Sequence, residues 1–356
     1  MINAVYFIIL REKLKNKLNY YTKSFNLRFR LAVIIIFFYY VNCWAQDAEF
    51  TQFYSNPLYY NPAFAGTKFG PRFILNFRDQ WPNLSAYTTY SASYDQFFDK
   101  IRSGIGVNVV EDVQGGGIYN TFTIDAMYSY QIKFTDDFNM NIAMEGGYFQ
   151  NTLNWADAVF YDQLNPSSPY TLGTTEETPP ENMKVTGPDF GAGFLAYGPH
   201  IYFGGSVQHL ITPKESFYNS DISATIPMRF SGNFGLEFVS DRNIKHNAFF
   251  SPNLIYLYQA GQSQLNLGSY FGITPLFIGM YFREDFTNPD AFILLAGFTE
   301  GVFKIAYSYD ITVSGLAGYT GGAHEVSLII NLGDRESATN NRQNAYKHSA
   351  ECPLIF

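Results

Sequence analysis

Charged side chains are scarce in this sequence of 356 residues. Asp, Glu, Lys and Arg make up 15% of it, whereas ordinary soluble domains carry about 25%. Hydrophobic residues make up 47% and aromatic residues 19%, with 28 Tyr and 35 Phe. A surface this poor in charge lacks the groups that keep a protein dissolved, so we expect much of it to face lipid.

Long apolar runs are also missing. The longest, Leu31–Val41, has eleven residues, and a membrane-spanning helix needs about 20. This excludes a bundle of transmembrane helices. It does not exclude membrane-spanning strands, because their polar and apolar residues alternate and average out over a hydropathy window.

Cysteine is limited to Cys43 and Cys352, which excludes an internal disulfide if the leader is removed. Residues 1–45 hold seven of the 23 Lys and Arg and one of the 31 Asp and Glu. The remainder therefore has 16 basic and 30 acidic residues, a net charge of −14. This charge argues against a nucleic-acid partner.

Residues 1–45 have the features of a secretory leader. Arg28 and Arg30 precede the apolar run Leu31–Val41, and small residues follow at Cys43 and Ala45. We predict a signal peptide over 1–45 that is cleaved after Ala45, so the mature protein is exported. Acylation of Cys43 and a membrane anchor are the alternatives, and eleven apolar residues are too few for an anchor.

Alternation with a period of two is clearest between Asn120 and Gln150. Apolar residues such as Ile124 and Tyr128 alternate with polar ones such as Asp125, and the pattern resumes after a polar turn at Lys133–Asp137. Each arm has the length of a tilted strand that crosses a bilayer. The hairpin alone fits either a soluble sandwich or a membrane barrel.

The same alternation recurs along the chain and predicts an all-β protein. About fourteen strands are expected, at Arg72–Asp79, Ala86–Asp95, Gly104–Val110, Tyr119–Gln131, Phe138–Leu153, Asp189–Tyr197, Ile201–Leu210, Met228–Val239, Phe249–Tyr258, Gln264–Ile273, Leu276–Arg283, Ala291–Thr299, Phe303–Asp310 and His324–Leu332.

The charges of these strands lie on the polar register, opposite the apolar side chains. We therefore expect them to face a lumen, because a charge that faces lipid at the midplane costs about 2–4 kcal/mol. The predicted lumen charges are Asp95, Asp125, Glu145, Arg229, Glu237, Arg283 and Lys304, in phase with Arg78, Asp310 and Glu325.

The lengths of the connections favour the barrel over the sandwich. Links after even-numbered strands are short, such as Gly198–His200, whereas the long links Asn154–Pro188, Ile211–Pro227 and Ile311–Ala323 all follow odd-numbered strands. Outer-membrane barrels have short periplasmic turns and long outer loops. We predict a transmembrane antiparallel β-barrel over 71–333 with both termini in the periplasm.

The segments that flank the barrel differ from strands. In residues 46–70, Asn56-Pro57 and Asn61-Pro62 force turns and remove backbone donors,. We predict that this N-terminal periplasmic segment plugs the lumen or closes its floor; contact with periplasmic machinery is the alternative. The polar residues 334–356 are predicted to form a C-terminal periplasmic tail.

Several ordered motifs resemble those of the PorP/SprF family. They are QFYSNPLYYNPAFAG from Gln52, RDQW from Arg78, SYDQ from Ser93, LNLG from Leu265, YSYDITVSGL from Tyr307 and GGAHEVSL from Gly321. The resemblance implies an outer-membrane protein of the type IX secretion system of Bacteroidetes. It also implies a large secreted or surface-anchored partner, such as a gliding adhesin, and possible contact with periplasmic type IX components.

The motif residues that we take as interaction candidates are Gln52, Phe53, Tyr54, Asn56, Pro57, Asn61, Pro62, Ala63, Phe64, Arg78, Trp81, Asp310, His324 and Glu325. No catalytic, cofactor or metal site is predicted. His209 and His324 lack a nucleophile motif or metal-ligand spacing. The acidic residues of 154–188 match no calcium-binding loop, so we interpret this segment as a solvated outer loop where a partner could dock.

Three functions remain open from the sequence. The first is a non-enzymatic outer-membrane barrel of the type IX pathway that assists secretion or surface anchoring of a partner protein. The second is a channel for small solutes, since mixed lumen charges suit both. The third is an outer-membrane hydrolase that depends on His209 or His324.

Overall fold

The computed structural model describes residues 46–333 apart from residues 69, 136, 165–172, 219–223, 241–247, 287–288 and 316–317, so the predicted signal peptide and tail lie outside it. The strands are β1 (Arg72–Gln80), β2 (Tyr87–Phe98), β3 (Ser103–Gln114), β4 (Tyr119–Lys133), β5 (Asn139–Leu153), β6 (Lys184–Tyr197), β7 (Ile201–Gln208), β8 (Arg229–Leu236), β9 (Phe238–Val239), β10 (Ala248–Gln259), β11 (Gln262–Ile273), β12 (Leu276–Glu284), β13 (Pro289–Glu300), β14 (Phe303–Thr312) and β15 (Ala323–Asn331).

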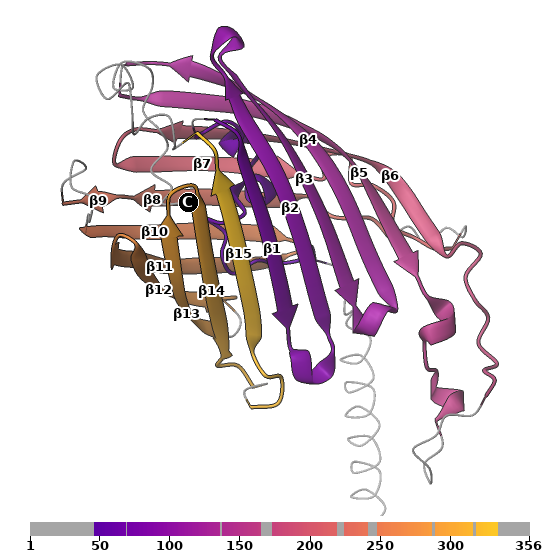
Figure 1. Cartoon of the computed structure of the whole chain (residues 1–356). Helices are drawn as coiled ribbons and strands as arrows, with labels where there is room; N and C mark the ends of the chain where they lie inside the picture. The colour runs from indigo at the N-terminus through magenta and orange to yellow at the C-terminus, as the bar shows by residue number, and fades with distance from the viewer. Residues whose placement is uncertain are drawn as a thin grey trace, which may run out of the picture. The chain divides into compact units, whose positions relative to one another are not determined.

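These strands form one antiparallel sheet that closes on itself (Figure 1). Consecutive strands pair with one another, except that β8 and β9 both pair with β10. β10 also pairs with β11, and β15 pairs with β1. Closure removes the free edges that would otherwise offer unpaired backbone groups. Because β8 and β9 are parts of one strand, the predicted antiparallel barrel of 14 strands is confirmed.

The two faces of the wall differ as the alternation predicted. In β1, Arg72, Asn76 and Arg78 are buried, whereas Phe73 and Leu75 are 43% and 50% exposed. The same division of polar and apolar side chains runs round the barrel. A strand turns successive side chains to opposite faces, so the polar set lines the interior and the apolar set forms the outer surface.

Proline divides the eighth strand into β8 and β9. Asn253 lies opposite Gly235, and Phe250 lies opposite Phe238, so this register sets Pro252 opposite Leu236. Proline has no N–H to donate to the ladder. The Ser251 hydroxyl donates to the Leu236 carbonyl oxygen instead, at 2.8 Å.

The expected start of the sixth strand at Asp189 is wrong, because β6 begins five residues earlier and runs through Pro188. The Phe190 carbonyl accepts a hydrogen bond from the backbone N–H of Leu210, just after β7. The even-numbered residues of β6, Pro188 among them, therefore direct their backbone groups toward the β7 side. Pairing with β7 begins only at Ala192. The missing donor of Pro188 therefore faces an open edge, where proline is tolerated.

The connections differ in length at the two ends of the barrel. Residues 99–102, 198–200, 274–275 and 301–302 are short links at one end, whereas residues 154–183, 209–228 and 313–322 are long links at the other. The links 115–118, 260–261 and 285–288 lie at the same end as the long links and are short. None of the helices in the described residues is long and apolar enough to cross a membrane.

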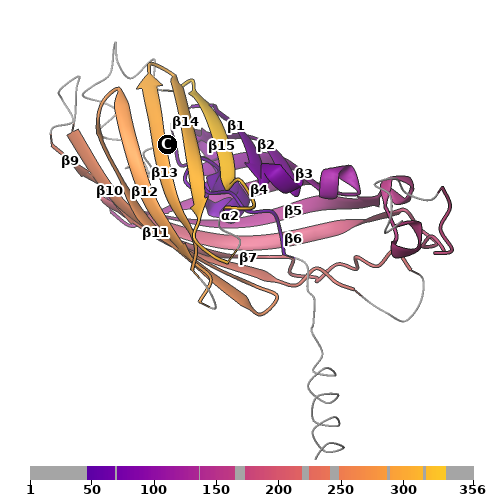
Figure 2. The same ribbon diagram turned by 90° about the horizontal axis from the view of Figure 1, so that it is seen from below.

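The residues before β1 lie inside the ring of strands. Seen from below, α2 (Pro57–Tyr60) is enclosed by the wall (Figure 2). We call residues 46–68 the inner segment. Nearly every residue from Phe50 to Thr67 is buried, so this segment supplies much of the interior apolar cluster.

Candidate functional site in the barrel lumen

The inner segment folds as two short turns rather than as a strand, as its Asn-Pro pairs indicate. Pro57 lies in the first turn of α2, where its fixed φ and missing N–H are tolerated,. Asn61 then caps the 3-10 helix η1 (Pro62–Phe64), and its side chain accepts a hydrogen bond from the Ala63 N–H at 2.9 Å,. The segment therefore satisfies part of its own backbone while it is enclosed.

A network of buried charges joins the inner segment to four strands. Arg78 of β1 lies 3.0 Å from Asp310 of β14 and 3.3 Å from Glu325 of β15. Arg283 of β12 lies 3.1 Å from the same Asp310. All four side chains are at most 3% exposed. Because buried charges are costly unless they are paired, each depends on the others.

Thr51 occupies the centre of this network. Its backbone N–H donates to Glu325 at 2.7 Å, and its hydroxyl donates to Asp310 at 2.7 Å. Arg78 and Arg283 both donate to the Thr51 hydroxyl oxygen. The wall charges are therefore bound to one residue of the inner segment as well as to each other.

Gln52 extends the contact along β14 and β15. Its amide donates to the Ser308 hydroxyl at 3.1 Å and to the Glu325 carbonyl at 3.0 Å. Its side-chain oxygen accepts from the Ser327 hydroxyl at 2.6 Å. The side chain is fully buried with its donors and acceptor satisfied, which specifies its position on the wall.

A second charged group lies at Asp47, on the opposite side of the ring. His209 Nε2 lies 2.8 Å from the Asp47 carboxylate, Arg229 of β8 lies 3.1 Å from it, and His209 Nδ1 lies 2.6 Å from Asp189. The Arg229 guanidinium also lies 4.4 Å from the centre of the Tyr59 ring, a cation–π contact, and donates to the Tyr59 carbonyl at 2.6 Å,.

These contacts shift the pKa values of Asp47 and His209, two groups that lie outside the strands. Burial acts to raise the pKa of Asp47, but the charges of His209 and Arg229 outweigh it and hold this pKa well below its ordinary value. Burial acts to lower the pKa of His209, but Asp47 and Asp189 outweigh it and raise this pKa to about 10. His209 is therefore protonated at neutral pH and forms ion pairs with both carboxylates.

A third contact joins the end of the inner segment to β1, β2 and β3. Arg72 Nε lies 2.8 Å from Asp95, whose other oxygen accepts from the Gly66 N–H at 2.8 Å. A Cβ added at Gly104 would lie 2.0 Å from the Ala65 carbonyl oxygen. Backbone therefore packs directly on backbone here, and only glycine permits the approach.

Asparagines position the middle of the segment. Asn61 donates to the Phe194 carbonyl at 3.0 Å and to Asn233 at 3.2 Å. Asn56 donates to Ser91 at 3.0 Å, and Asn141 of β5 donates to the Ala63 carbonyl at 3.0 Å. The segment is thus bonded to strands all round the ring.

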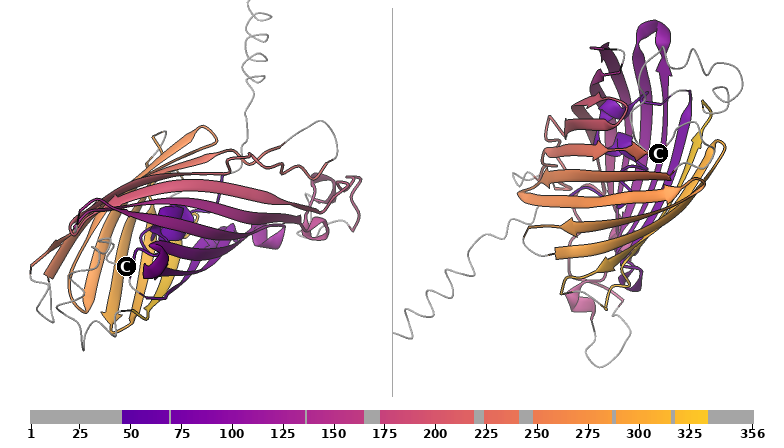
Figure 3. Two further views of the ribbon diagram at one scale, coloured as in Figure 1. Left: turned by 90° about the horizontal axis from the view of Figure 1, so that it is seen from above. Right: turned by 90° about the vertical axis from the view of Figure 1, so that its left-hand side faces the viewer.

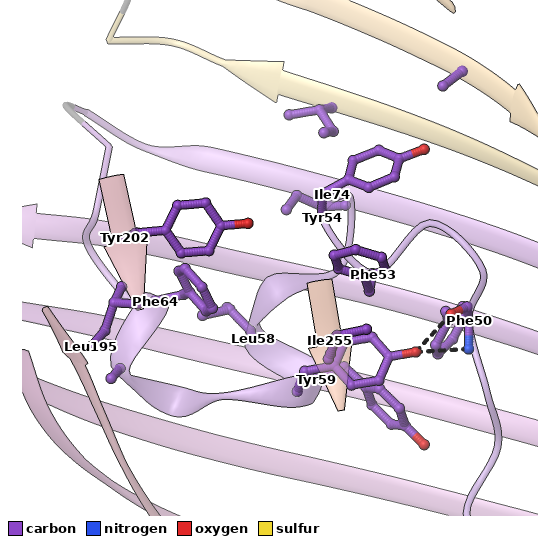
Figure 4. Close-up of a cluster of buried hydrophobic side chains, with 14 of the residues drawn as sticks. Phe50, Phe53, Tyr54, Leu58, Tyr59, Phe64, Ile74, Leu195, Tyr202 and Ile255 are labelled. Carbon is purple, nitrogen blue, oxygen red and sulfur yellow. Dashed lines mark hydrogen bonds between the residues drawn. The ribbon is translucent and has the colours of Figure 1, made fainter. Parts of the chain in front are cut away.

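Aromatic rings fill the remaining space (Figure 4). Tyr54 packs edge to face on Tyr270 with ring centres 4.3 Å apart, and Phe53 packs in the same way on Tyr281 at 5.5 Å. Phe64 meets Tyr202 at 6.0 Å. Such pairs contribute about 0.5–1.5 kcal/mol each beyond their buried area.

Most of the motif residues chosen from the sequence meet in the lumen. Twelve of them, from two distant parts of the chain, are buried in or around the inner segment: Gln52, Phe53, Tyr54, Asn56, Pro57, Asn61, Pro62, Ala63, Phe64, Arg78, Asp310 and Glu325. Trp81 and His324 lie apart from this group at the rim. The Trp81 ring meets Tyr87 at 5.8 Å, and His324 Nδ1 lies 2.7 Å from the Tyr307 hydroxyl on the outer side.

The lumen charges fall into two groups. Asp95, Glu145, Arg229 and Arg283 are at most 5% exposed, and Glu145 accepts from Gln208 at 3.2 Å. Asp125, Glu237 and Lys304 are only partly buried. Asp125 lies over Gly147 of the adjacent strand, whereas Glu237 and Lys304 lie near strand ends.

Sequence reasoning missed Asp47, Thr51, Arg72 and Asp189. Arg72 shares its register with Arg78, so the alternation of β1 could have identified it. Asp47 and Thr51 lie outside any alternating segment and carry no pattern. Among the described residues, no group of three or more His, Cys, Asp and Glu side chains is arranged to hold a metal ion.

The family model described as type IX secretion system membrane protein PorP/SprF matches residues 42–330. This chain belongs to the PorP/SprF family. The match spans the inner segment and every strand of the barrel except the last residue of β15. Family membership, together with the closed barrel and its apolar exterior, assigns this PorP/SprF protein to the outer membrane, as predicted.

Solved barrels are similar to this PorP/SprF protein at low sequence identity. The outer membrane protein Omp33 of Acinetobacter baumannii has 7% identity and a TM-score of 0.40, over 73% of this chain and 98% of that one. BamA from Haemophilus ducreyi lacking POTRA domains 1–3 has 9% identity and a TM-score of 0.37, over 73% of this chain and 70% of that one. The KdgM porin has 7% identity and a TM-score of 0.35, over 73% of this chain and 99% of that one. No curated protein matches the sequence.

Proposed function

We propose that this PorP/SprF protein assists the secretion or surface anchoring of a partner protein by the type IX system, without catalysis. The family match over residues 42–330 carries this proposal. We assign His209 a structural role, because its ring is bound by Asp47 of the inner segment and by Asp189 of β6. Such an arrangement positions the segment rather than a substrate.

We further propose that the inner segment closes the lumen at rest. Its support is the continuous burial from Phe50 to Thr67 and the contacts with strands on opposite sides of the ring. The proposal includes a periplasmic position for both termini, because the long links then face outward, as in outer-membrane barrels.

Gene deletion tests the secretion role. We expect loss of one large protein from the cell surface with unchanged uptake of small solutes. Altered uptake with a normal set of surface proteins would instead support a solute channel. Restoration by the His209→Ala variant would be consistent with a non-enzymatic role.

Conductance across planar bilayers tests the closure. Deletion of residues 52–65 removes the centre of the inner segment, so we expect a steady ion conductance that the full protein lacks. The control is the full protein at the same insertion density. An unchanged conductance would rule out the inner segment as the barrier.

A further inference from the structure

The link between β5 and β6 projects beyond the end of the barrel (Figure 3). We call its described residues, 154–164 and 173–183, the acidic arm. Residues 154–183 contain Asp157, Asp162, Glu176, Glu177 and Glu181, and no Lys, Arg or His. All five carboxylate residues are exposed. The arm therefore presents charge of one sign only.

The acidic arm also exposes large apolar side chains. Tyr161 is 91% exposed, and Val159 and Leu164 are 57% and 54% exposed. They lie beyond the strands, so a lipid-facing wall does not account for them. Exposed apolar patches that are rimmed by polar groups mark protein or membrane interaction sites.

Hydrogen bonds give the acidic arm a defined conformation. At its base the Leu153 N–H donates to the Met183 carbonyl at 2.9 Å, and Asn154 donates to Ile118 at 2.8 Å. Farther out, the Trp155 and Phe160 rings pack with centres 4.5 Å apart. Side chains on an ordered scaffold lose less entropy when a partner binds.

One carboxylate closes the arm on itself. Asp162, in the 3-10 helix η6 (Tyr161–Gln163), accepts from the Thr175 hydroxyl at 2.9 Å and from the Glu176 N–H at 2.6 Å. The backbone bond from Glu176 lowers the pKa of Asp162, with a further contribution from Thr175. Asp162 thus remains ionised and brings the two halves of the arm together.

The adjacent link between β7 and β8 supports the arm from one side. Asn182 donates to the Phe217 carbonyl at 3.2 Å, and the Phe217 ring meets Tyr119 of β4 at 6.0 Å. Asn151 of β5 donates to Glu215 at 3.0 Å. Two long links therefore act as one structural unit at this end of the barrel.

We propose that the acidic arm is the docking surface for a protein that presents Lys or Arg beside exposed apolar side chains. Charge complementarity selects this chemistry, because the arm offers carboxylates and apolar groups but no cation. The same charge disfavours an anionic lipid surface. The identity of the occupant rests on the proposed function: it is the protein that the barrel helps to export or retain.

Photo-crosslinking in cells identifies the occupant. A photoreactive phenylalanine replaces Tyr161, or Tyr319 as the control, which is 75% exposed in the link between β14 and β15. We expect position 161, and not position 319, to crosslink the surface protein that gene deletion removes. Crosslinks to lipid or lipopolysaccharide alone, or equal products at both positions, would overturn the proposal.

A charge-matched pair of variants tests the chemistry of the contact. Asp157→Asn with Glu176→Gln and Glu177→Gln removes three of the five carboxylates of the arm and leaves Asp162 and Glu181. Asp99→Asn with Asp137→Asn and Glu300→Gln neutralises three exposed carboxylates at the other end, two in short links and one at the end of β13. We expect the arm variant alone to reduce the yield of the crosslink at position 161 by about tenfold. Added salt should reduce the yield less in the arm variant than in the native protein, because fewer charges remain to be screened.

The outcomes separate this inference from the proposed function. If gene deletion removes the surface protein but the arm variant leaves both its surface level and the crosslink unchanged, the docking surface is wrong and the secretion role stands. If gene deletion leaves every surface protein in place, the secretion role fails. Immunoblotting of the barrel in each strain confirms that it is present.

Discussion

The Arg78 guanidinium lies 3.0 Å from the Asp310 carboxylate, across the intervening strand β15. The Thr51 hydroxyl lies within hydrogen-bond distance of both. Two residues that are 232 positions apart in the chain thus bind a third from the N-terminal segment. The pair joins the wall to the inner segment, so its loss should affect both stability and closure.

Arg78→Ala removes the cation that pairs with Glu325 and leaves Arg283 as a partner of Asp310. Loss of one partner from a buried ion pair costs about 3–5 kcal/mol. We expect a lower unfolding temperature in detergent and intermittent conductance in planar bilayers. Arg102→Ala, at an exposed turn residue, serves as the control. Equal behaviour of the two variants would contradict a role for Arg78 in closure.

Gly104→Ala tests the backbone contact between β3 and the inner segment. The new Cβ would lie 2.0 Å from the Ala65 carbonyl oxygen, so the inner segment must move while the strand keeps its pairing. Overpacking of this kind costs about 1–3 kcal/mol. We expect increased conductance with unchanged strand content by circular dichroism. Gly232→Ala in β8, whose Cβ has no neighbour within 4 Å, should remain closed.

The His209–Asp47 ion pair predicts how stability depends on pH. The pKa of His209 is raised from 6.5 to about 10, so its contribution is complete below pH 6.5 and declines as the pH rises to about 10. The pKa of Asp47 is lowered from 3.8, so its contribution is present above that pH and is lost as the pH falls below it. Unfolding temperatures from pH 6 to 10 measure the first effect.

His209→Gln provides the comparison for that measurement. The variant retains a polar side chain but cannot titrate, so its unfolding temperature should fall less steeply than that of the native protein between pH 7 and 10. His200→Gln, at an exposed position in the link between β6 and β7, should follow the native curve. If the unfolding temperatures of the native protein and of His209→Gln changed equally with pH, the His209–Asp47 ion pair would not contribute to stability.

The apolar exterior predicts a depth-dependent cost for charge. Met144 is 67% exposed on β5, and Phe134 is 60% exposed in the turn before it. Met144→Arg should destabilise the barrel in bilayers by about 2–4 kcal/mol and Phe134→Arg by about 1 kcal/mol or less. Reversible unfolding in urea from liposomes measures both. Similar small costs would show that Met144 does not face lipid.

The alternation of side chains was sufficient to predict the wall. Most observed strand ends lie within a few residues of the expected ones, because one face of each strand is apolar and the period of two fixes its register,. The start of β6 was missed because Pro188 suggests a break. The missing donor of Pro188 faces an edge where no strand pairs, and this edge exists because β7 is shorter than β6.

The contacts inside the lumen could not be predicted in this way. The sequence indicated that Arg78, Asp310 and Glu325 share the inner face, but it did not show that Thr51 joins them. It singled out His209 without its partners Asp47 and Asp189. These contacts depend on the path of the inner segment, which has no periodic pattern.

The sequence by itself determined a closed wall with an apolar exterior and a charged interior, since alternation and link lengths are local properties of the chain. Only the tertiary structure decided what occupies that interior. Closure brings β1, β12, β14 and β15 round one N-terminal segment, and burial then requires each charge and backbone donor to find a partner there.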